Sequence, residues 1–187
     1  MKTHLEDEGI QVYSLNDFPD VTEVLEDGAT FRENALKKAR QVARLTGKLT
    51  VADDSGLEVS GLAGRPGVLS ARYAGEGATD DENNEKLLEE LKGLPSEKRR
   101  ASFRCALALV DPSGGEIVIE DECRGIILTA RRGNRGFGYD PLFFFLPLNK
   151  TFAEMTGEEK NRVSHRGKAL RRLKETLKDK VAGTAPP

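Results

Sequence analysis

The stretch Ala101–Val110 (ASFRCALALV) restricts the fold more than any other part of this sequence. Apolar and polar residues alternate in its first half and the second half is wholly apolar, which is typical of a long strand that enters a buried layer. Asp111–Gly115 (DPSGG) consists of turn-forming residues, so we expect residues 116–122 to return as the second strand of a hairpin. Cys123–Thr129 is predicted to continue as a strand across a bulge at Gly125.

The first clear helix is predicted over residues 31–46. Thr30 followed by Glu33 has the spacing of a capping box, and Gly47 is a typical end signal. Apolar residues recur on one face of this segment at helical spacing, with lysines and arginines off that face.

The rest of the chain alternates between short strands, glycine-rich loops and helices. Capping residues predict helices after Thr79 (with Glu82), Thr156 (with Glu159) and Ser164. Short strands are predicted over Ile10–Leu15, Leu49–Ala52 and Pro141–Leu146, and loops over residues 53–77 and 132–140. This order of elements predicts a mixed α/β fold.

Composition excludes several classes of protein. The 187 residues suit one domain with a core of its own, and no apolar run approaches the roughly 18 residues of a membrane span. Two cysteines and two histidines are too few for a disulfide framework or a zinc site. We therefore expect a cytoplasmic protein whose metal, if it binds one, is a hard cation held by carboxylates.

Charge is distributed unevenly along the chain. Residues 1–35 carry two basic and nine acidic side chains, whereas residues 131–187 carry thirteen basic and six acidic ones. A basic C-terminal third beside acidic residues could bind a polyanion bridged by a metal ion. Equally, the lysines and arginines could simply solvate the outer faces of helices.

The most distinctive local pattern is residues 51–56 (VADDSG), in which a buried strand is followed by Asp53 and Asp54. Ligands of α/β sheets usually bind at strand ends. Two adjacent carboxylates repel each other, so they tend to hold a divalent cation or to raise one pKa. The structural alternative is a turn closed by Asp54 and Gly56.

Glu33 lies one helical turn into the first helix, close in sequence to that strand. It could serve as a metal ligand facing Asp53 and Asp54. Its alternative role is to cap the helix, which is worth roughly 1 kcal/mol.

The segment 133–140 (GNRGFGYD) could approach a ligand closely, because its glycines free the backbone. Phe137 and Tyr139 offer stacking faces, and Asp140 could accept hydrogen bonds from a base edge. The spacing matches neither a dinucleotide fingerprint nor a P-loop. The alternative is a hairpin loop in which both aromatic rings are buried.

Lys160 and the run Ser164-His165-Arg166 fall on or between the last two helices. Their hydrogen-bond donors suit an anion or a purine carbonyl group. The alternative is a capping serine with solvated basic neighbours. No serine lies in a nucleophile-elbow sequence, so a catalytic triad is not indicated.

Five segments, taken together, resemble the inosine triphosphate pyrophosphatase family in order and spacing. They are residues 30–35 (TFRENA), 52–57 (ADDSGL), 66–75 (PGVLSARYAG), 136–141 (GFGYDP) and 164–167 (SHRG). The resemblance covers roughly residues 8–180. It implies one two-lobed domain over residues 1–180, with a disordered tail at 181–187. The implied fold is a mixed, strongly twisted sheet flanked by helices, with an active-site cleft between the lobes.

The resemblance also implies an activity. Enzymes of this family hydrolyse deaminated purine nucleoside triphosphates (XTP, ITP and dITP) to the monophosphate and pyrophosphate with Mg²⁺, which clears them from the nucleotide pool. It implies a homodimer that acts on a small-molecule nucleotide, without nucleic acid or membrane partners.

Residue by residue, the resemblance implies that Glu33 and Asp54 hold Mg²⁺ and that Asp54, with Asp53 nearby, activates the attacking water. Ser55 would contact the substrate and Phe137 would stack on the purine. The remaining implied substrate-binding residues are Gly138, Tyr139, Asp140, Lys160, His165 and Arg166.

One departure from the family pattern concerns the triphosphate grip. Family members begin with a strand and a loop of the type Thr-x-Asn-x-x-Lys, which has no counterpart in this sequence. Met1–Gly9 is expected to be the end of the helix after that loop, with the natural start upstream. Two alternatives to the enzyme are a catalytically impaired nucleotide-binding remnant and an RNA-binding module, although the latter lacks the aromatic RNA-recognition signature.

Overall fold

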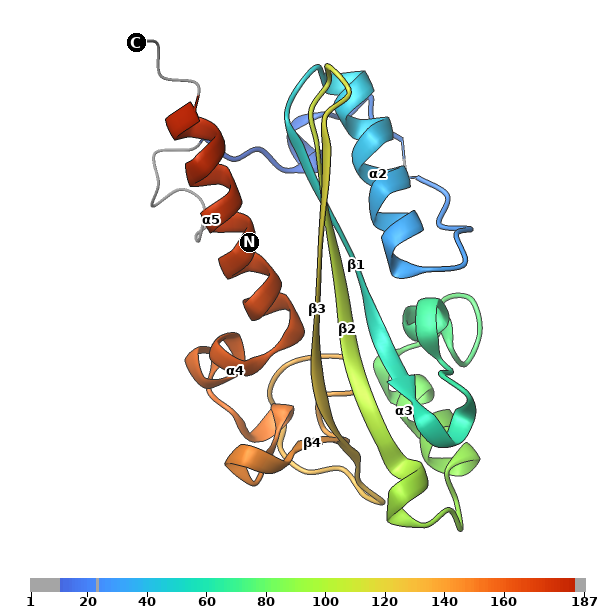
Figure 1. Cartoon of the computed structure of the whole chain (residues 1–187). Coiled ribbons are helices and arrows are strands. Elements are labelled where there is room, and N and C mark those ends of the chain that lie inside the picture. The colour runs from blue at the N-terminus through green and yellow to red at the C-terminus, as the bar shows by residue number, and fades with distance from the viewer. Residues whose placement is uncertain (1–10, 23, 184–187) are drawn as a thin grey trace. The chain divides into compact units, whose positions relative to one another are not determined.

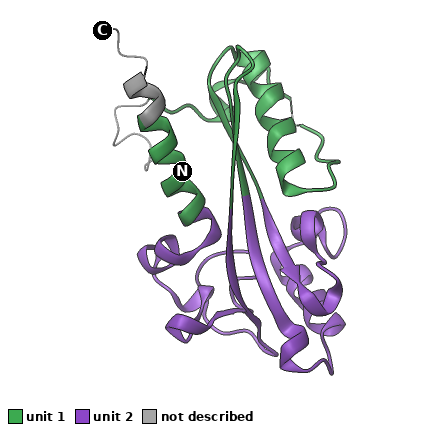
Figure 2. Cartoon of the chain, viewed as in Figure 1, with its two compact units in different colours: residues 1–54, 106–120, 168–187 green, residues 55–105, 121–167 purple. Residues whose placement is uncertain are grey.

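The computed structural model of the chain describes residues 11–22 and 24–183 and divides into two compact units (Figures 1 and 2). Unit 1 consists of the described residues up to Asp54, Ala106–Glu120 and the chain from Lys168. Unit 2 consists of Ser55–Cys105 and Asp121–Gly167. The helix end predicted at Met1–Gly9 lies outside the described residues.

The fold is mixed α/β, as predicted, with a five-stranded antiparallel sheet in the order β1-β2-β3-β4-β5. Its strands are β1 (Thr50–Val59), β2 (Arg100–Val110), β3 (Glu116–Ile127), β4 (Phe143–Phe145) and β5 (Lys150–Thr151). The predicted turn joins β2 to β3, with the Asp111 N–H donating to the Gly115 carbonyl at 2.8 Å. In β3–β4 pairing, Ile126 lies opposite Phe144.

Within residues 11–22 and 24–183, four α-helices accompany the sheet: α2 (Phe31–Thr46), α3 (Asp80–Glu90), α4 (Gly157–Val163) and α5 (His165–Gly183). Within unit 1, α2 and α5 lie on opposite sides of the strands (Figure 1). In unit 2 the core is a cluster of aromatic and aliphatic side chains, in which the Phe103 and Phe143 rings are 4.6 Å apart. None of the described helices combines the length and the apolar character that a bilayer span needs.

Helix α2 begins and ends where its sequence predicts. The Thr30 side chain accepts the Glu33 N–H at 3.1 Å, and Gly47 ends the helix with a φ of 63°. The second half of the predicted capping box is shifted by one residue, because Glu33 Oε2 accepts the Ala29 N–H at 2.8 Å instead of that of Thr30.

Three predicted strands differ from the structure. Residues 11–14 have no regular structure and Leu15–Asp17 forms a 3₁₀ turn, so the strand predicted at Ile10–Leu15 is wrong where it is described. Strand β1 extends to Val59, through the start of the predicted loop, because Leu57 and Val59 are fully buried in the unit 2 core. Strand β4 is shorter than predicted. The N–H groups of Leu142 and Phe143 both donate to the Tyr139 carbonyl, so the chain forms a turn before the strand begins.

Helix α5 continues to Gly183, and residues 184–187 lie outside the described residues.

Arg99 is a buried guanidinium in unit 2 that joins the end of α3 to the end of β3. It donates to the carbonyls of Leu91, Ile127 and Leu128 at 2.6–2.8 Å. We predict that Arg99→Ala lowers the free energy of unfolding by about 3 kcal/mol, because three carbonyls lose their donor in a buried setting. Urea denaturation measures this loss. Arg100→Ala removes the same side chain from the next, exposed position, and an equal loss in both variants would contradict the prediction.

Candidate active site

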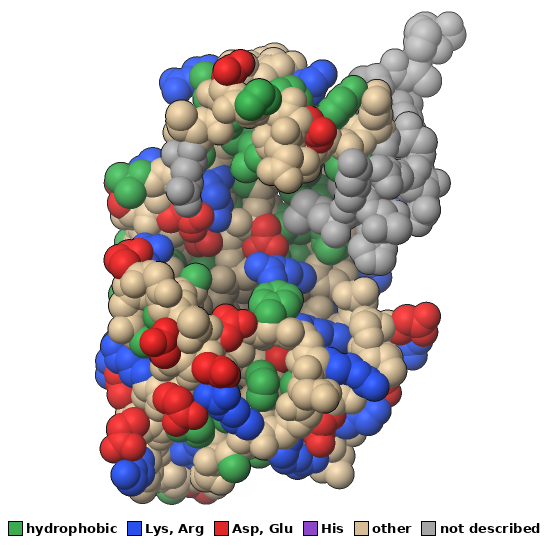
Figure 3. Space-filling view, turned by 180° about the vertical axis from the view of Figure 1, so that it is seen from behind, with side chains coloured by type: hydrophobic (Ala, Val, Ile, Leu, Met, Phe, Trp, Pro, Cys, Tyr) green, Lys and Arg blue, Asp and Glu red, His purple; other side chains and the backbone are tan. Residues whose placement is uncertain are grey.

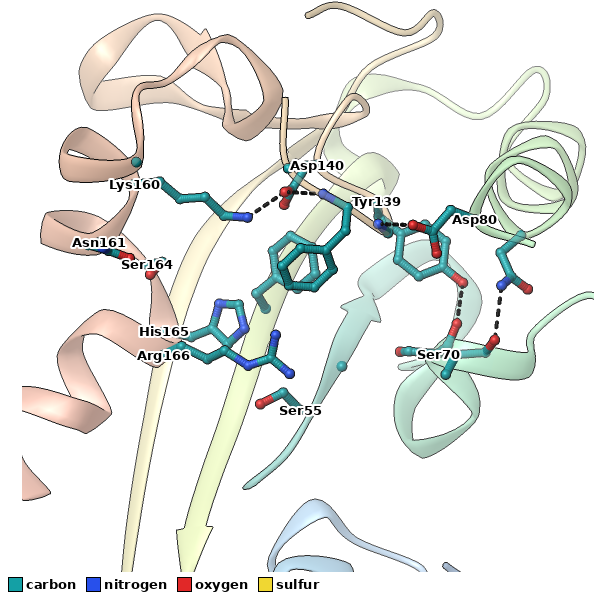
Figure 4. Close-up of a pocket in the computed structure, with 18 residues that line it drawn as sticks. Ser55, Ser70, Asp80, Tyr139, Asp140, Lys160, Asn161, Ser164, His165 and Arg166 are labelled. Atoms are coloured by element: carbon teal, nitrogen blue, oxygen red, sulfur yellow. Dashed lines mark hydrogen bonds and ion pairs between the residues drawn. The ribbon is translucent and has the colours of Figure 1, made fainter. Parts of the chain in front are cut away.

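Unit 2 contains a pocket of about 420 Å³, formed by β1, β2, the 136–140 loop, α3, α4 and the start of α5 (Figure 4). All the predicted substrate-binding residues line it: Ser55, Phe137, Gly138, Tyr139, Asp140, Lys160, His165 and Arg166. Ser70, Asp80, Asn83 and Asn161 also line it and were not predicted from the sequence. The structure therefore brings together segments that lie more than a hundred residues apart in the chain.

The loop is folded around the Asp140 carboxylate, which is 2% exposed. Its Oδ2 accepts the Phe137 N–H at 2.9 Å and forms an ion pair with the Lys160 ammonium. Gly136 has a φ of 80°, and a Cβ there would collide with the same carboxylate. The closeness of this packing explains why a glycine is needed at position 136.

The two aromatic rings of the loop have opposite environments. Tyr139 is 4% exposed and its hydroxyl donates to the Ser70 carbonyl at 2.9 Å. Phe137 is 60% exposed, with the Lys160 Nζ 4.6 Å and the Arg166 guanidinium carbon 5.4 Å from its ring centroid. The alternative of two buried rings is thus correct for Tyr139 and wrong for Phe137, whose ring is available for stacking.

The Ser164-His165-Arg166 run lies at the junction of α4 and α5. Ser164 caps α5, as the alternative interpretation expected, by accepting the Gly167 N–H at 3.1 Å. His165 is 6% exposed and stacks on Phe103 with ring centroids 4.9 Å apart. The junction therefore has a structural role and also directs basic side chains to the pocket (Figure 4).

Asp54 lies within β1 and in unit 1, and not after the end of a strand as its sequence predicted. Its Oδ2 accepts a hydrogen bond from the Asn34 amide at 3.1 Å, and its Oδ1 lies 3.3 Å from the Lys38 Nζ. Burial raises the pKa of Asp54 to about 6, an effect that Lys38 and Asn34 oppose and Glu26 reinforces. A carboxyl group with a pKa in this range can take up and release protons near neutral pH.

Glu26 is a second carboxylate of this group, and sequence reasoning missed it. The Lys38 Nζ lies 3.0 Å from Glu26 Oε1, so one ammonium group bridges Glu26 and Asp54. Glu26, Lys38 and Asp53 line a hollow of about 780 Å³ in unit 1. The four-residue spacing of Asn34 and Lys38, which puts both on one face of α2, could have revealed part of this group, but no local pattern marks Glu26.

Glu33 has the capping role that its sequence offered as the alternative to metal binding. It caps α2 through the Ala29 N–H and lines a separate hollow with Lys37 and Arg40. It is adjacent to Asn34 in sequence, so it is rotated by about 100° around the helix axis from the face that meets Asp54. Among the residues that the structure describes, no three His, Cys, Asp or Glu side chains form a ready-made metal cluster.

Many basic side chains of the C-terminal third are neutralised by acidic neighbours. Arg132 pairs with Glu154 at 3.0 Å and Lys150 with Glu159 at 2.7 Å. On the face shown in Figure 3, acidic and basic side chains are interspersed. This arrangement agrees with the alternative in which the lysines and arginines solvate the outer faces of helices.

Comparison with known proteins shows that the model of one protein family, Ham1, matches residues 1–176 of this chain. The chain belongs to the Ham1 family. It is 53% identical to the dITP/XTP pyrophosphatase of Desulforamulus reducens, over 90% of this chain and 84% of that protein. It is 50% identical to the dITP/XTP pyrophosphatase of Clostridium perfringens, over 95% of this chain and 90% of that protein.

Solved Ham1 structures share the fold. A HAM1 protein from Coxiella burnetii matches with a TM-score of 0.89 and 40% identity, over 95% of this chain and 91% of that one. The dITP/XTP pyrophosphatase of Mycobacterium abscessus matches with a TM-score of 0.78 and 48% identity, over 90% and 88% of the two chains. The family resemblance inferred from the five sequence segments is therefore confirmed.

The raised pKa of Asp54 predicts a pH-dependent stability. Between about pH 4 and pH 6, Asp54 keeps its proton in the folded protein but has released it in the unfolded chain. The stabilisation from this group is therefore complete below about pH 4 and is lost as the pH rises through about 6. We predict that Asp54→Asn, which has no charge to bury, gains stability relative to the wild type between pH 4 and pH 7. Thermal melts of both proteins across this range measure the difference, and a constant difference would contradict the prediction.

Proposed function

We propose that this protein hydrolyses deaminated purine nucleoside triphosphates (XTP, ITP and dITP) to the monophosphate and pyrophosphate in a Mg²⁺-dependent reaction. The observation that carries the proposal is the unit 2 pocket, in which the exposed Phe137 ring lies beside Lys160 and Arg166. A flat aromatic face with cationic neighbours suits a purine that carries phosphates. The printed names of the relatives point to the same substrates.

Base selection follows from the hydrogen-bonding chemistry of the pocket. Lysine and arginine only donate hydrogen bonds, so Lys160 and Arg166 match the 6-oxo group of hypoxanthine and xanthine. Adenine presents an amino group at that position, which would need an acceptor. Lys160 and the Phe137 N–H both bind Oδ2 of Asp140. Because the two cationic groups of the pocket only donate, we expect it to discriminate against ATP.

The water-activating group in this proposal is Asp54. A pKa of about 6 leaves its carboxylate mostly ionised at neutral pH. An ionised carboxylate can accept a proton from water as the water attacks a phosphorus atom. Ser55, the next residue of β1, lines the purine pocket.

The residues around Lys38 include a second carboxylate, Glu26, that could hold a divalent cation with Asp54. Glu26 and Asp54 converge on one ammonium group, and paired carboxylate oxygens are the donors that Mg²⁺ prefers. We therefore assign the metal-holding role to Glu26 and Asp54, with Glu33 kept as a helix cap. Bound there, Mg²⁺ would offset the negative charge of the phosphates.

The resemblance adds two further elements to the proposal, a homodimer and a cytoplasmic location. Light scattering on the purified protein tests the first, and fractionation of the cells that produce it tests the second.

The test of the proposed function is pyrophosphate release from ITP, XTP, GTP and ATP, with Mg²⁺ and with EDTA. We expect release from ITP and XTP to exceed that from ATP and to require Mg²⁺. Asp54→Asn should reduce kcat by about 10²-fold or more, since it removes the proton acceptor. Binding of ITP without turnover by the wild type would contradict the proposal and favour a nucleotide-binding remnant.

A second prediction separates the two candidate metal ligands. Glu26→Gln should raise the Mg²⁺ concentration that gives half-maximal activity by about tenfold, because a neutral amide is a weaker ligand than a carboxylate. Glu33→Gln is the matched control and should leave this concentration within about twofold, because an amide oxygen still accepts the Ala29 N–H. The reverse order would return the ligand role to Glu33.

A further inference from the structure

Gly138 is the residue between the two aromatic rings of the pocket loop, and a single helix holds both of its main-chain polar groups. Its N–H donates to Asp80 Oδ2 at 2.6 Å, and its carbonyl accepts the Asn84 amide at 2.9 Å. Asp80 and Asn84 lie four residues apart, on one face of the first turns of α3. Figure 4 shows Asp80 directed at this part of the loop.

These two hydrogen bonds at Gly138 affect the position of the neighbouring Phe137 ring. At 60% exposure, the ring is not fixed by a surrounding core, so its position depends on the backbone that carries it. Asp140 holds the Phe137 N–H, on one side of that residue. Asp80 holds the next N–H along the chain, which belongs to the same peptide plane as the Phe137 carbonyl. The two carboxylates therefore restrain both peptide planes next to the stacking residue.

Helix α3 is well suited to act as the rigid side of this contact. Thr79 and Glu82 form a complete capping box at its start, and Leu87 is fully buried in the unit 2 core. Asn83, one residue before Asn84, accepts the Ala74 N–H at 2.7 Å and donates to the Ala71 carbonyl at 3.1 Å. Ala71 belongs to another part of the pocket lining, so the same turn of α3 holds two separate parts of it.

We infer that Asp80, assisted by Asn84, is a positioning residue for purine binding: it fixes the Gly138 peptide and thereby the Phe137 ring. The inference rests on the proposed function for its kinetic consequence. A carboxylate is the stronger acceptor for an N–H, so it holds the loop more firmly than a neutral group does. The neighbouring Asp81 has a different role, because it pairs with Arg131.

The kinetic test compares Asp80→Ala, Asp80→Asn and Asp81→Ala with the wild type, with ITP as substrate. We expect Asp80→Ala to raise KM about tenfold with kcat changed by less than about threefold, because a loosened stacking residue weakens binding of ground state and transition state alike. Asp80→Asn retains an oxygen acceptor and should restore most of the affinity. Asp81→Ala removes the same charge from the same helical turn and should leave KM unchanged, since Arg131 keeps Glu85 as a partner.

Hydrogen exchange at the Gly138 amide, followed by NMR in the protein without nucleotide, tests the contact independently of catalysis. We expect exchange to accelerate in Asp80→Ala by about tenfold or more relative to Asp81→Ala. Unchanged exchange, or equal KM values for Asp80→Ala and Asp81→Ala, would overturn the inference. A wild type that turns over none of the nucleotides would overturn the proposed function instead, and the exchange rates would still decide the role of Asp80.

Discussion

The buried ion pair between Asp140 and Lys160 is the interaction on which the pocket of unit 2 depends. A carboxylate that is 2% exposed loses its hydration and needs both a counter-charge and hydrogen-bond donors in return. Lys160 supplies the charge from α4, and the Phe137 N–H supplies a donor from the loop itself. Satisfying this one group therefore fixes the curvature of the loop and its distance from α4.

The same ion pair gives Lys160 two roles. Its ammonium group binds Asp140 and also lies 4.6 Å from the centre of the Phe137 ring. A lysine held in this way loses little conformational freedom when a ligand arrives, because its side chain is already ordered. The ion pair thus orders the Lys160 ammonium group, the Phe137 ring and the loop before a ligand binds. Asp80 of α3 restrains the same loop through the Gly138 N–H.

Local signals in the sequence predicted the helices well, and non-local contacts explain the errors. The caps at Thr30, Thr79 and Thr156 depend on residues three positions apart, so the sequence contains the whole interaction. The length of β1 depends instead on Leu57 and Val59 reaching a core built from distant segments, which the intervening polar run of Asp53–Ser55 obscures. The pocket residues were predicted because five motifs resembled one family, and no periodicity alone would have grouped them.

Glu33 and Glu26 show the same limit at the level of a single site. A glutamate three residues after a threonine has an obvious local partner, and the helix cap uses it. Glu26 precedes the helix in a segment without regular structure, so only the folded chain reveals that Lys38 bridges it to Asp54. Helix capping does not explain why the Lys38 ammonium group lies between two carboxylates. Burial raises the pKa of one of them, Asp54, to about 6. The acidic group around Lys38 is therefore a candidate functional site, whereas the hydrogen bond that Glu33 makes is that of the α2 cap.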